Sequence, residues 1–242
     1  MAVNINTVYL RVLAIANKEQ RGYITPQEFN TLANQAQLDI FEQYFYDLNQ
    51  FLRLPGNDTI HADPVDMLEE KIEIFDKFNQ TVAMSSGGVG DLTNSNANKI
   101  YRLGAVYAQT SINGVATIIE AEHLNKNEIR QHLNSPLTSP TVKRPVYIKT
   151  TETAIQMFPT SITANVTCNF IAKPVDVYWG YNIINGEALY NPASSINFEL
   201  HASEETELVL KILSLAGVVI RDPQLYQIAA AEDAKNIQQE KQ

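Results

Sequence analysis

The side chains best suited to hold a metal ion or to transfer protons stand together at one point of the chain. Glu120, Glu122 and His123 fall within GVATIIEAEH, a stretch whose composition is typical of a β-strand. Successive side chains of a strand point to opposite faces, so the two carboxylates share one face and His123 points to the other. A metal ion needs ligands that converge on it. We therefore interpret these residues as a solvated strand end rather than a metal site.

Other residue types used in catalysis or metal binding are sparse. His61, His132 and His201 show no HExxH or other recognised ligand spacing. The single Cys168 can make neither an internal disulfide nor a structural zinc site, and we expect it to be a small core residue. No GxSxG elbow is present. The sequence predicts no catalytic residue, no metal site, no cofactor and no enzyme.

The glycine-rich stretch GGVG at residues 87–90 shares its composition with phosphate-binding loops. Such a loop of the ATPase kind needs GxxxxGK[ST] between a strand and a helix. Here no lysine follows, a helix is predicted before the stretch, and strands are predicted after it. We expect residues 83–98 to form a flexible loop, not a nucleotide site.

Carboxylate pairs are harder to exclude, because partners distant in sequence can meet in the fold. Glu120 with Glu152 is the pair that a hydrolase would use. A cleft converging on both residues would favour that function, and a convex β surface would count against it.

Further acids lie on a predicted helix. Glu69, Glu70 and Glu73 occur there with Lys71 and Lys77. Glu73 and Lys77 have the i,i+4 spacing of an ordinary surface ion pair, which contributes little to stability. We interpret this group as a solvated helix face.

Aromatic residues concentrate in two stretches. The first is a predicted helix on which six of them point in several directions: Phe29, Phe41, Tyr44, Phe45, Tyr46 and Phe51. Either a core helix covered on several sides or a subunit interface would explain it, since Tyr and Phe are enriched in interfaces. The second stretch carries Tyr178, Trp179 and Tyr181 at a strand end, and there we favour an interface.

The net charge of −9 is distributed unevenly. Residues 1–82 carry −6, residues 99–200 carry +1 and residues 203–242 carry −3, with Asp91 supplying the rest. Tight binding to phosphate backbones needs clustered Lys and Arg, so we do not expect sequence-specific nucleic-acid binding. No apolar run reaches the roughly 18 residues of a membrane span, and the N-terminus is a poor signal peptide.

Helices are expected at the N-terminal end, in residues 1–82. The first covers roughly 4–18. The second begins at YITPQEF, where Thr25 and Glu28 form a capping box, Pro26 takes the first helical position, and Ile24 and Phe29 form a hydrophobic staple. That helix is predicted to reach about residue 52, and a third is predicted to run from Asp63-Pro64 to about residue 80.

Strands are expected in residues 99–202. They comprise 99–109 and 114–123 around a turn, a hairpin over 146–159, and 163–174 with Ala164, Val166, Cys168 and Phe170 on its buried face. A short helix with a capping box from Asn125 to Glu128 interrupts them. Alternation with one buried face indicates an antiparallel sheet.

Residues 203–242 return to helix. Ser203 is the expected cap of a largely buried helix, and Asp222-Pro223 begins a second one. The fold class predicted is therefore α+β: a helical N-terminal part, a central antiparallel β region with a short helix, and a C-terminal helix pair that packs back on the N-terminal helices. We expect one structural unit.

This layout resembles a family of viral structural proteins. RPVYIK lies in the central β region and IAKPVDVYW ends its last strand, while GYITPQEFNTLANQAQLDIFEQYF and FELHASEETELVLKILSLAGV flank the region. These stretches resemble the ring-forming head-to-tail connector or tail-tubular proteins of tailed bacteriophages, the crAss-like type above all. The resemblance covers most of the chain, with no signal in residues 84–98 or at the far C-terminus.

The resemblance implies a homo-oligomeric ring, a dodecamer, stacked below the portal protein and against neighbouring tail or ring proteins. It implies a place in the neck or tail of the virion after assembly in the bacterial host cytoplasm. Genomic DNA would be a partner only in passage during ejection, and no membrane is involved. An acidic protein suits such a conduit, because negative walls repel phosphates. A stopper or a tail-proximal ring would fit the same pattern.

Two other functions stay open at this stage. One is a non-virion phage protein that acts as a host-factor binding module. The other is the carboxylate hydrolase that would use Glu120 with Glu152.

Overall fold

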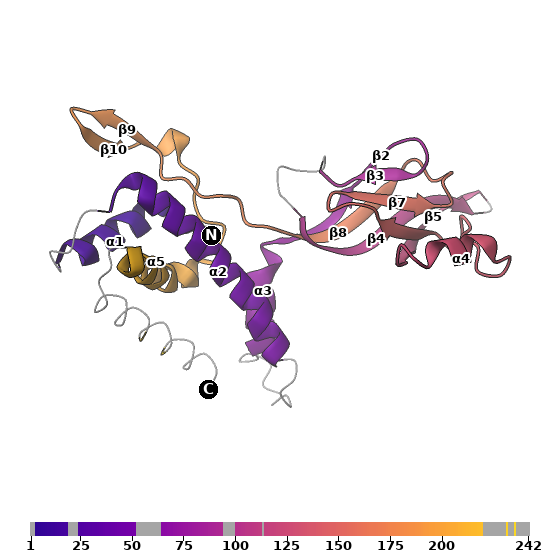
Figure 1. The fold of residues 1–242 in the computed structure, drawn as a ribbon, viewed down its shortest axis with the longest axis horizontal. Coiled ribbons are helices and arrows are strands. Elements are labelled where there is room, and N and C mark those ends of the chain that lie inside the picture. The colour runs from indigo at the N-terminus through magenta and orange to yellow at the C-terminus, as the bar shows by residue number, and fades with distance from the viewer. Residues whose placement is uncertain are drawn as a thin grey trace. The chain divides into compact units, whose positions relative to one another are not determined.

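The computed structural model divides the chain into two compact units (Figure 1). Unit 1 comprises Met1–Ile74 with Pro174–Gln242, and unit 2 comprises Phe75–Lys173. The fold is mixed α+β, as predicted. The residues that the structure describes are 3–18, 24–51, 64–93, 100–112, 114–219, 231 and 235.

The division differs from the one predicted. The sequence predicts one structural unit with a β-rich part over residues 99–202. The main sheet instead begins at Asp76 and ends at Ala172, and residues 174–202 belong with the helices.

Helices α1 (Ile5–Lys18) and α2 (Pro26–Phe51) lie close to their predicted positions. The predicted capping box is present: the Thr25 N–H donates to Glu28 Oε2 at 2.9 Å, and the Glu28 N–H donates to Thr25 Oγ1 at 3.3 Å. Hydrogen bonds from the Thr25 backbone and hydroxyl hold the pKa of Glu28 below its ordinary value. Ile24 and Phe29, the predicted staple, are both buried.

Helix α3 (Pro64–Glu73) ends earlier than the predicted residue 80. Strand β1 (Asp76–Thr81) takes up the rest of that segment, because its backbone pairs with β8 (Val166–Ala172), about 90 residues away. Lys77 therefore lies on a strand, and the predicted helical i,i+4 pair with Glu73 is wrong.

Helix α5 (Glu205–Val219) packs against α1 and α2, so the C-terminal part returns to the N-terminal helices as predicted. The short 3-10 turn η2 (Ala202–Glu204) precedes it. The predicted cap, Ser203, is wrong: its N–H donates to Nδ1 of His201, which is the residue that caps η2. The second C-terminal helix, predicted from Asp222, falls outside the described residues except for 231 and 235.

Unit 1 also contains a hairpin that the sequence analysis did not predict. Strands β9 (Tyr181–Ile184) and β10 (Glu187–Tyr190) pair only with each other. Asn185 and Gly186 join them with φ values of 55° and 86°, the two positive angles that a type I′ turn requires. The 3-10 turn η1 (Pro192–Ser194) follows.

Unit 2 is built on an eight-stranded sheet with the order β1-β8-β4-β5-β6-β7-β3-β2. All neighbours are antiparallel except β5 and β6. The two end strands of this order are consecutive in sequence, with Val82 alone between them, so the sheet curls round until its edges are joined by the chain. The other six strands of this sheet are β2 (Ala83–Met84), β3 (Val89–Asp91), β4 (Ile100–Ile112), β5 (Val115–His123), β6 (Val146–Lys149) and β7 (Ala154–Phe158).

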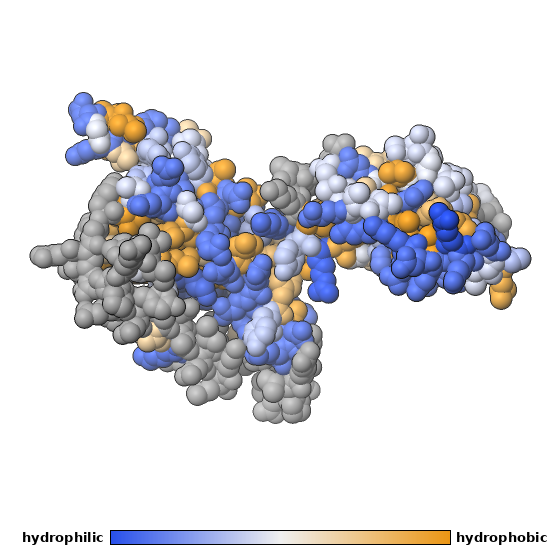
Figure 2. Space-filling model, in the orientation of Figure 1, coloured by the Kyte–Doolittle hydropathy of each residue, from blue (hydrophilic) through white to orange (hydrophobic). Residues whose placement is uncertain are grey.

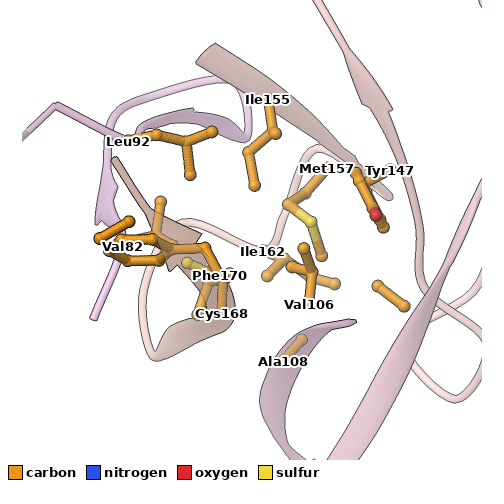
Figure 3. Close-up of a cluster of buried hydrophobic side chains, with 13 residues drawn as sticks. Val82, Leu92, Val106, Ala108, Tyr147, Ile155, Met157, Ile162, Cys168 and Phe170 are labelled. Atoms are coloured by element: carbon orange, nitrogen blue, oxygen red, sulfur yellow. The ribbon is translucent and has the colours of Figure 1, made fainter. Parts of the chain in front are cut away.

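The core of unit 2 lies inside this curled sheet (Figure 3). Side chains from β4, β7 and β8 point towards one another there, and Val166, Cys168 and Phe170 alternate inward along β8 as predicted. The prediction is wrong for Ala164, which is exposed because β8 begins only at Val166. Helix α4 (Ile129–Asn134) adds a smaller cluster in which Ile129 packs with Val146 and Ile148.

The capping box predicted for this short helix is wrong. Helix α4 begins only after Glu128, whose conformation is already helical and which makes no side-chain cap. Asn125 instead donates from its side-chain amide to the Glu128 carboxylate at 3.4 Å.

The glycine-rich stretch is part of the sheet, which corrects the prediction of a loop over all of residues 83–98. Strands β2 and β3 pair there, and Gly87 and Gly88 form the turn with φ values of 83° and 76°. A Cβ on Gly88 would lie 2.7 Å from the Met157 carbonyl oxygen. The glycines thus serve a tight turn and close packing, and residues 94–98 lie outside the described part.

Among the residues that the structure describes, no helix combines the length and apolarity needed to cross a bilayer.

Candidate functional site

The three residues first considered for chemistry line one shallow depression on unit 2. Glu120, Glu122 and His123 are exposed on β5, and with Gly104, Ala105, Ala121 and Tyr147 they surround a volume of about 510 Å³. The His123 ring lies 5.1 Å from that of Tyr147. Burial is the main cause that raises the pKa of Tyr147, and the nearby carboxylate of Glu120 adds to the shift. Among the residues that the structure describes, no three acidic, histidine or cysteine side chains are grouped to hold a metal ion.

The carboxylate pair proposed for a hydrolase does not converge. Glu122 pairs with Val146 in the parallel ladder of β5 and β6, so Glu120 lies before this point. Glu152 lies beyond the far end of β6, in the turn to β7. At about 3.3 Å per residue, the backbone positions of the two residues are separated by roughly 16 Å or more along the strands. Glycosidase carboxylates lie about 5 to 9.5 Å apart.

Cys168 is buried in the sheet core, as predicted. Burial raises the pKa of its thiol to about 11, so it is a neutral thiol at physiological pH. Only the thiolate is a strong nucleophile, and this position therefore favours packing over chemistry.

The aromatic residues of α2 belong mainly to the core of unit 1. Phe29, Phe41 and Tyr44 are buried and Phe45 is half-buried. Tyr46 is 60% exposed and accepts a hydrogen bond from the side-chain amide of Gln50 at its hydroxyl. The side chain of Phe51 lies outside the described residues. The core interpretation holds for the buried members, and among the aromatic side chains of α2 that the structure describes, Tyr46 alone is exposed.

Trp179 is also a core residue, so the interface interpretation is wrong for it. It is 3% exposed, and its ring centroid lies 4.3 Å from that of Tyr9. The rings of Tyr181 and Tyr190 lie on it at 5.8 and 5.7 Å, and its Nε1 donates to Asn6 Oδ1 at 3.1 Å. Tyr178, the preceding residue, is 42% exposed.

An amide ladder on α2, which the sequence analysis missed, positions this tryptophan. Asn30, Asn34 and Gln37 occupy successive turns of one helix face and bond the extended segment 175–179. The Trp179 N–H donates to Asn30 Oδ1 and the Val177 N–H to Asn34 Oδ1, both at 2.7 Å. The spacing of 30, 34 and 37 was visible in the sequence as three amides on one face.

Exposed apolar side chains gather on the hairpin β9–β10. Ile183 is 71% exposed, Ile184 53% and Leu189 49%, and Figure 2 shows hydrophobic colour at this hairpin. A groove of about 620 Å³ runs between the hairpin and the start of α2; its lining includes Thr25, Pro26, Gln27, Tyr181, Ile183 and Glu187. Exposed apolar groups of this kind mark contact surfaces.

Acidic side chains form the outer face of α3. Glu69, Glu70 and Glu73 are exposed there, as predicted. Lys71 instead turns inward, where its Nζ lies 2.7 Å from Glu204 Oε1 and 5.6 Å from the centre of the Tyr44 ring.

The buried partner of Lys71 is ionised. Burial alone would raise the pKa of Glu204. Hydrogen bonds with Glu207, Lys71 and Ser203, together with the charge of Lys71, outweigh that effect and lower it. Lys71 and Glu204 therefore form an ion pair inside unit 1.

Comparison with known proteins adds no assignment: no family model matches the chain, and no curated protein matches it.

Proposed function

We propose that this protein is a virion structural protein, a ring-forming head-to-tail connector that lies below the portal and extends the channel for DNA ejection. The observation that carries the proposal is the exposed apolar hairpin β9–β10. A two-stranded hairpin is marginally stable by itself in water, and Ile183, Ile184 and Leu189 remain largely open to solvent. Such a surface fits a subunit that is completed by its neighbours.

The resemblance to phage connector and tail-tubular proteins supplies the identity of those neighbours. They are further copies of this chain in a twelve-fold ring, the portal protein, and adjoining tail or ring proteins. The acidic composition, net −9, supports a role beside a DNA channel, because it opposes trapping of the phosphate backbone. Genomic DNA is a partner only in passage, and the protein resides in the neck or tail of the virion after assembly in the host cytoplasm.

Imaging of purified virions by electron cryo-microscopy tests this function. We expect density that fits units 1 and 2 in a ring between the portal and the tail. A virion preparation without the chain would overturn the proposal. If the chain is instead recovered bound to a host protein in infected cells, the host-factor binding function is the correct one.

A further inference from the structure

The two units carry opposite net charges. Unit 1 contains 21 acidic and 9 basic residues, for a net charge of −12, whereas unit 2 contains 6 acidic and 9 basic residues, for a net charge of +3. The overall charge of −9 conceals this difference. Two surfaces, one in each unit, account for much of it.

The first surface is the outer face of α3, which we call the acidic face. Asp66, Glu69, Glu70 and Glu73 are exposed on it, and Met67 lies among them with 53% of its surface open. The structure gives none of the four carboxylates an ion pair with a described residue. Lys71, the basic residue of this helix, is engaged with Glu204.

This arrangement disfavours the isolated helix. Like charges three and four residues apart repel on a helix surface, and the acidic face contains several such pairs. Glu70 and Glu73 also lie towards the C-terminal end, where the helix dipole disfavours negative charge. A cationic partner on this face would remove both penalties.

The second surface lies around α4 and β6, and we call it the basic face. Its cationic residues are Lys126, Arg130, Lys143, Arg144 and Lys149, and Glu128 is the single acid between residues 125 and 150. Figure 2 shows strongly hydrophilic side chains over this part of unit 2. The nearest acids on the adjoining strand are Glu120 and Glu122.

Local packing holds these cations in place. Ile129 anchors α4 on Val146 and Ile148 of β6, and Lys126 Nζ donates to the Thr150 carbonyl at 2.7 Å. Arg130, Lys143 and Arg144 are exposed and form no ion pair within the described part of the chain. Leu133 and Leu137 are exposed beside them, at 43% and 87%.

We propose that the basic face of one copy docks on the acidic face of a second copy of this chain. Lysine and arginine would pair with the four carboxylates, while Leu133 and Leu137 would meet Met67. The charge complementarity between the two faces points to this occupant. The inference rests on the proposed function in that a ring needs a repeating contact between copies.

The contact is heterologous, because it joins two different surfaces. Repetition of such a contact closes a ring or extends a filament, whereas a two-fold contact would stop at a dimer. Each copy keeps one face of each kind free for its next neighbour.

Charge reversal in the full chain tests the contact. Two variants, Glu69→Lys with Glu70→Lys and Lys143→Glu with Arg144→Glu, each reverse two charges on one face and so cancel the net charge of that face. The mass of the assemblies is followed by analytical ultracentrifugation at low and high salt. We expect wild-type self-association to weaken about tenfold or more with added salt and with either reversal, because exposed charges are screened and like charges repel. Circular dichroism checks that each variant is folded.

Mixing the two variants and measuring their association gives the most specific test. An equimolar mixture, or one chain that carries both double substitutions, places the new lysines opposite the new glutamates wherever two substituted faces meet, and association should recover. The matched control, Glu42→Lys with Asp176→Lys, makes the same charge change at exposed positions outside the acidic face. It should associate no less than the wild type.

Several results would overturn the inference. They are a wild-type chain that stays monomeric at low salt, association that ignores the single reversals, and a mixture that does not recover. A basic-face reversal that weakens binding to a duplex DNA probe but leaves association unchanged would also overturn it. A virion ring held by other surfaces would refute this contact and leave the proposed function intact, whereas absence from the virion would refute that function alone.

Discussion

Unit 1 and unit 2 satisfy their buried groups in different ways. Three of the four buried polar or charged side chains among the described residues lie in unit 1, namely Gln37, Asp47 and Glu204, whereas unit 2 has Thr110. Unit 1 ties the extended segment 175–179 to α2 with side-chain amides. Unit 2 satisfies its backbone in the strand ladder and fills its interior with apolar side chains. The stability of unit 1 should therefore respond to polar changes, and that of unit 2 to side-chain volume.

The largest effect is expected from a cavity in unit 2. Phe170→Ala removes a ring that is 2% exposed in the core of the curled sheet, and we expect a loss of about 3–5 kcal/mol in unfolding free energy. Chemical denaturation measures the loss, and hydrogen exchange assigns it to residues 75–173. The matched control, Phe78→Ala, removes a ring that is 74% exposed and should change stability by about 0.5 kcal/mol or less. Equal loss of protection in unit 1 would refute the comparison.

The next largest effect concerns the buried ion pair of unit 1. Lys71→Met leaves the Glu204 carboxylate buried without its cation, which we expect to cost about 3 kcal/mol at neutral pH. Adding Glu204→Gln should restore part of the loss, because no charge is then left unpaired. Thermal denaturation of the single and double variants measures both. A double variant no more stable than the single one would contradict this explanation.

The same pair makes the stability of unit 1 depend on pH. The pKa of Glu204 is lowered from an ordinary value of 4.5, so its contribution is complete above that value. The contribution is lost as the pH falls through the lower pKa of the folded state. The Lys71→Met variant should lose less on acidification than the wild type, as measured by denaturation at a series of acidic pH values.

A smaller effect is expected from the amide ladder. Asn34→Ala removes the acceptor of the Val177 N–H and the donor to the Val177 carbonyl, at 2.7 and 3.0 Å. Leaving these buried groups without partners should cost about 1–3 kcal/mol. The control Gln35→Ala removes an exposed amide one position along and should be close to neutral. Similar losses in both variants would mean that helix propensity, not the ladder, is responsible.

The smallest effect on folding should come from the hairpin. Ile183→Ser replaces a side chain that is 71% exposed, so the unfolding free energy should change by about 0.5 kcal/mol or less. If the hairpin contacts a neighbour in the virion, the variant will be incorporated less than the wild type. Quantitative mass spectrometry of purified particles measures incorporation, with Asn182→Ser as the control. Normal incorporation would remove the hairpin from the contact surfaces.

What the sequence could predict depended on how local the signal was. The start of α2 is encoded by Thr25, Pro26 and Glu28 within four positions, and the structure confirms it. The end of α3 was predicted too late because β1 is stabilised by pairing with β8, a long-range contact that the local sequence does not predict. The burial of Trp179 was missed for the same reason, since its cover comes from Tyr9, far away along the chain.

The charged faces show a further limit of composition. Residues 99–200 have a net charge of only +1, because the cations near α4 are counted there together with the acids Asp176, Glu187 and Glu199 of unit 1. Only the unit boundary at residues 74 and 174 separates −12 from +3. Strand alternation predicts Glu120 and Glu122 on one face and His123 on the other, yet all three line one depression in the structure.

The chain contains one tryptophan and one cysteine, and each lies in the core of a different unit. Trp179 fluorescence therefore reports on unit 1, and the rate at which Cys168 reacts with a thiol reagent reports on the opening of unit 2. Trp179 and Cys168 are therefore intrinsic probes, one for each unit. Whether the two units unfold together or in sequence can be followed without any added label.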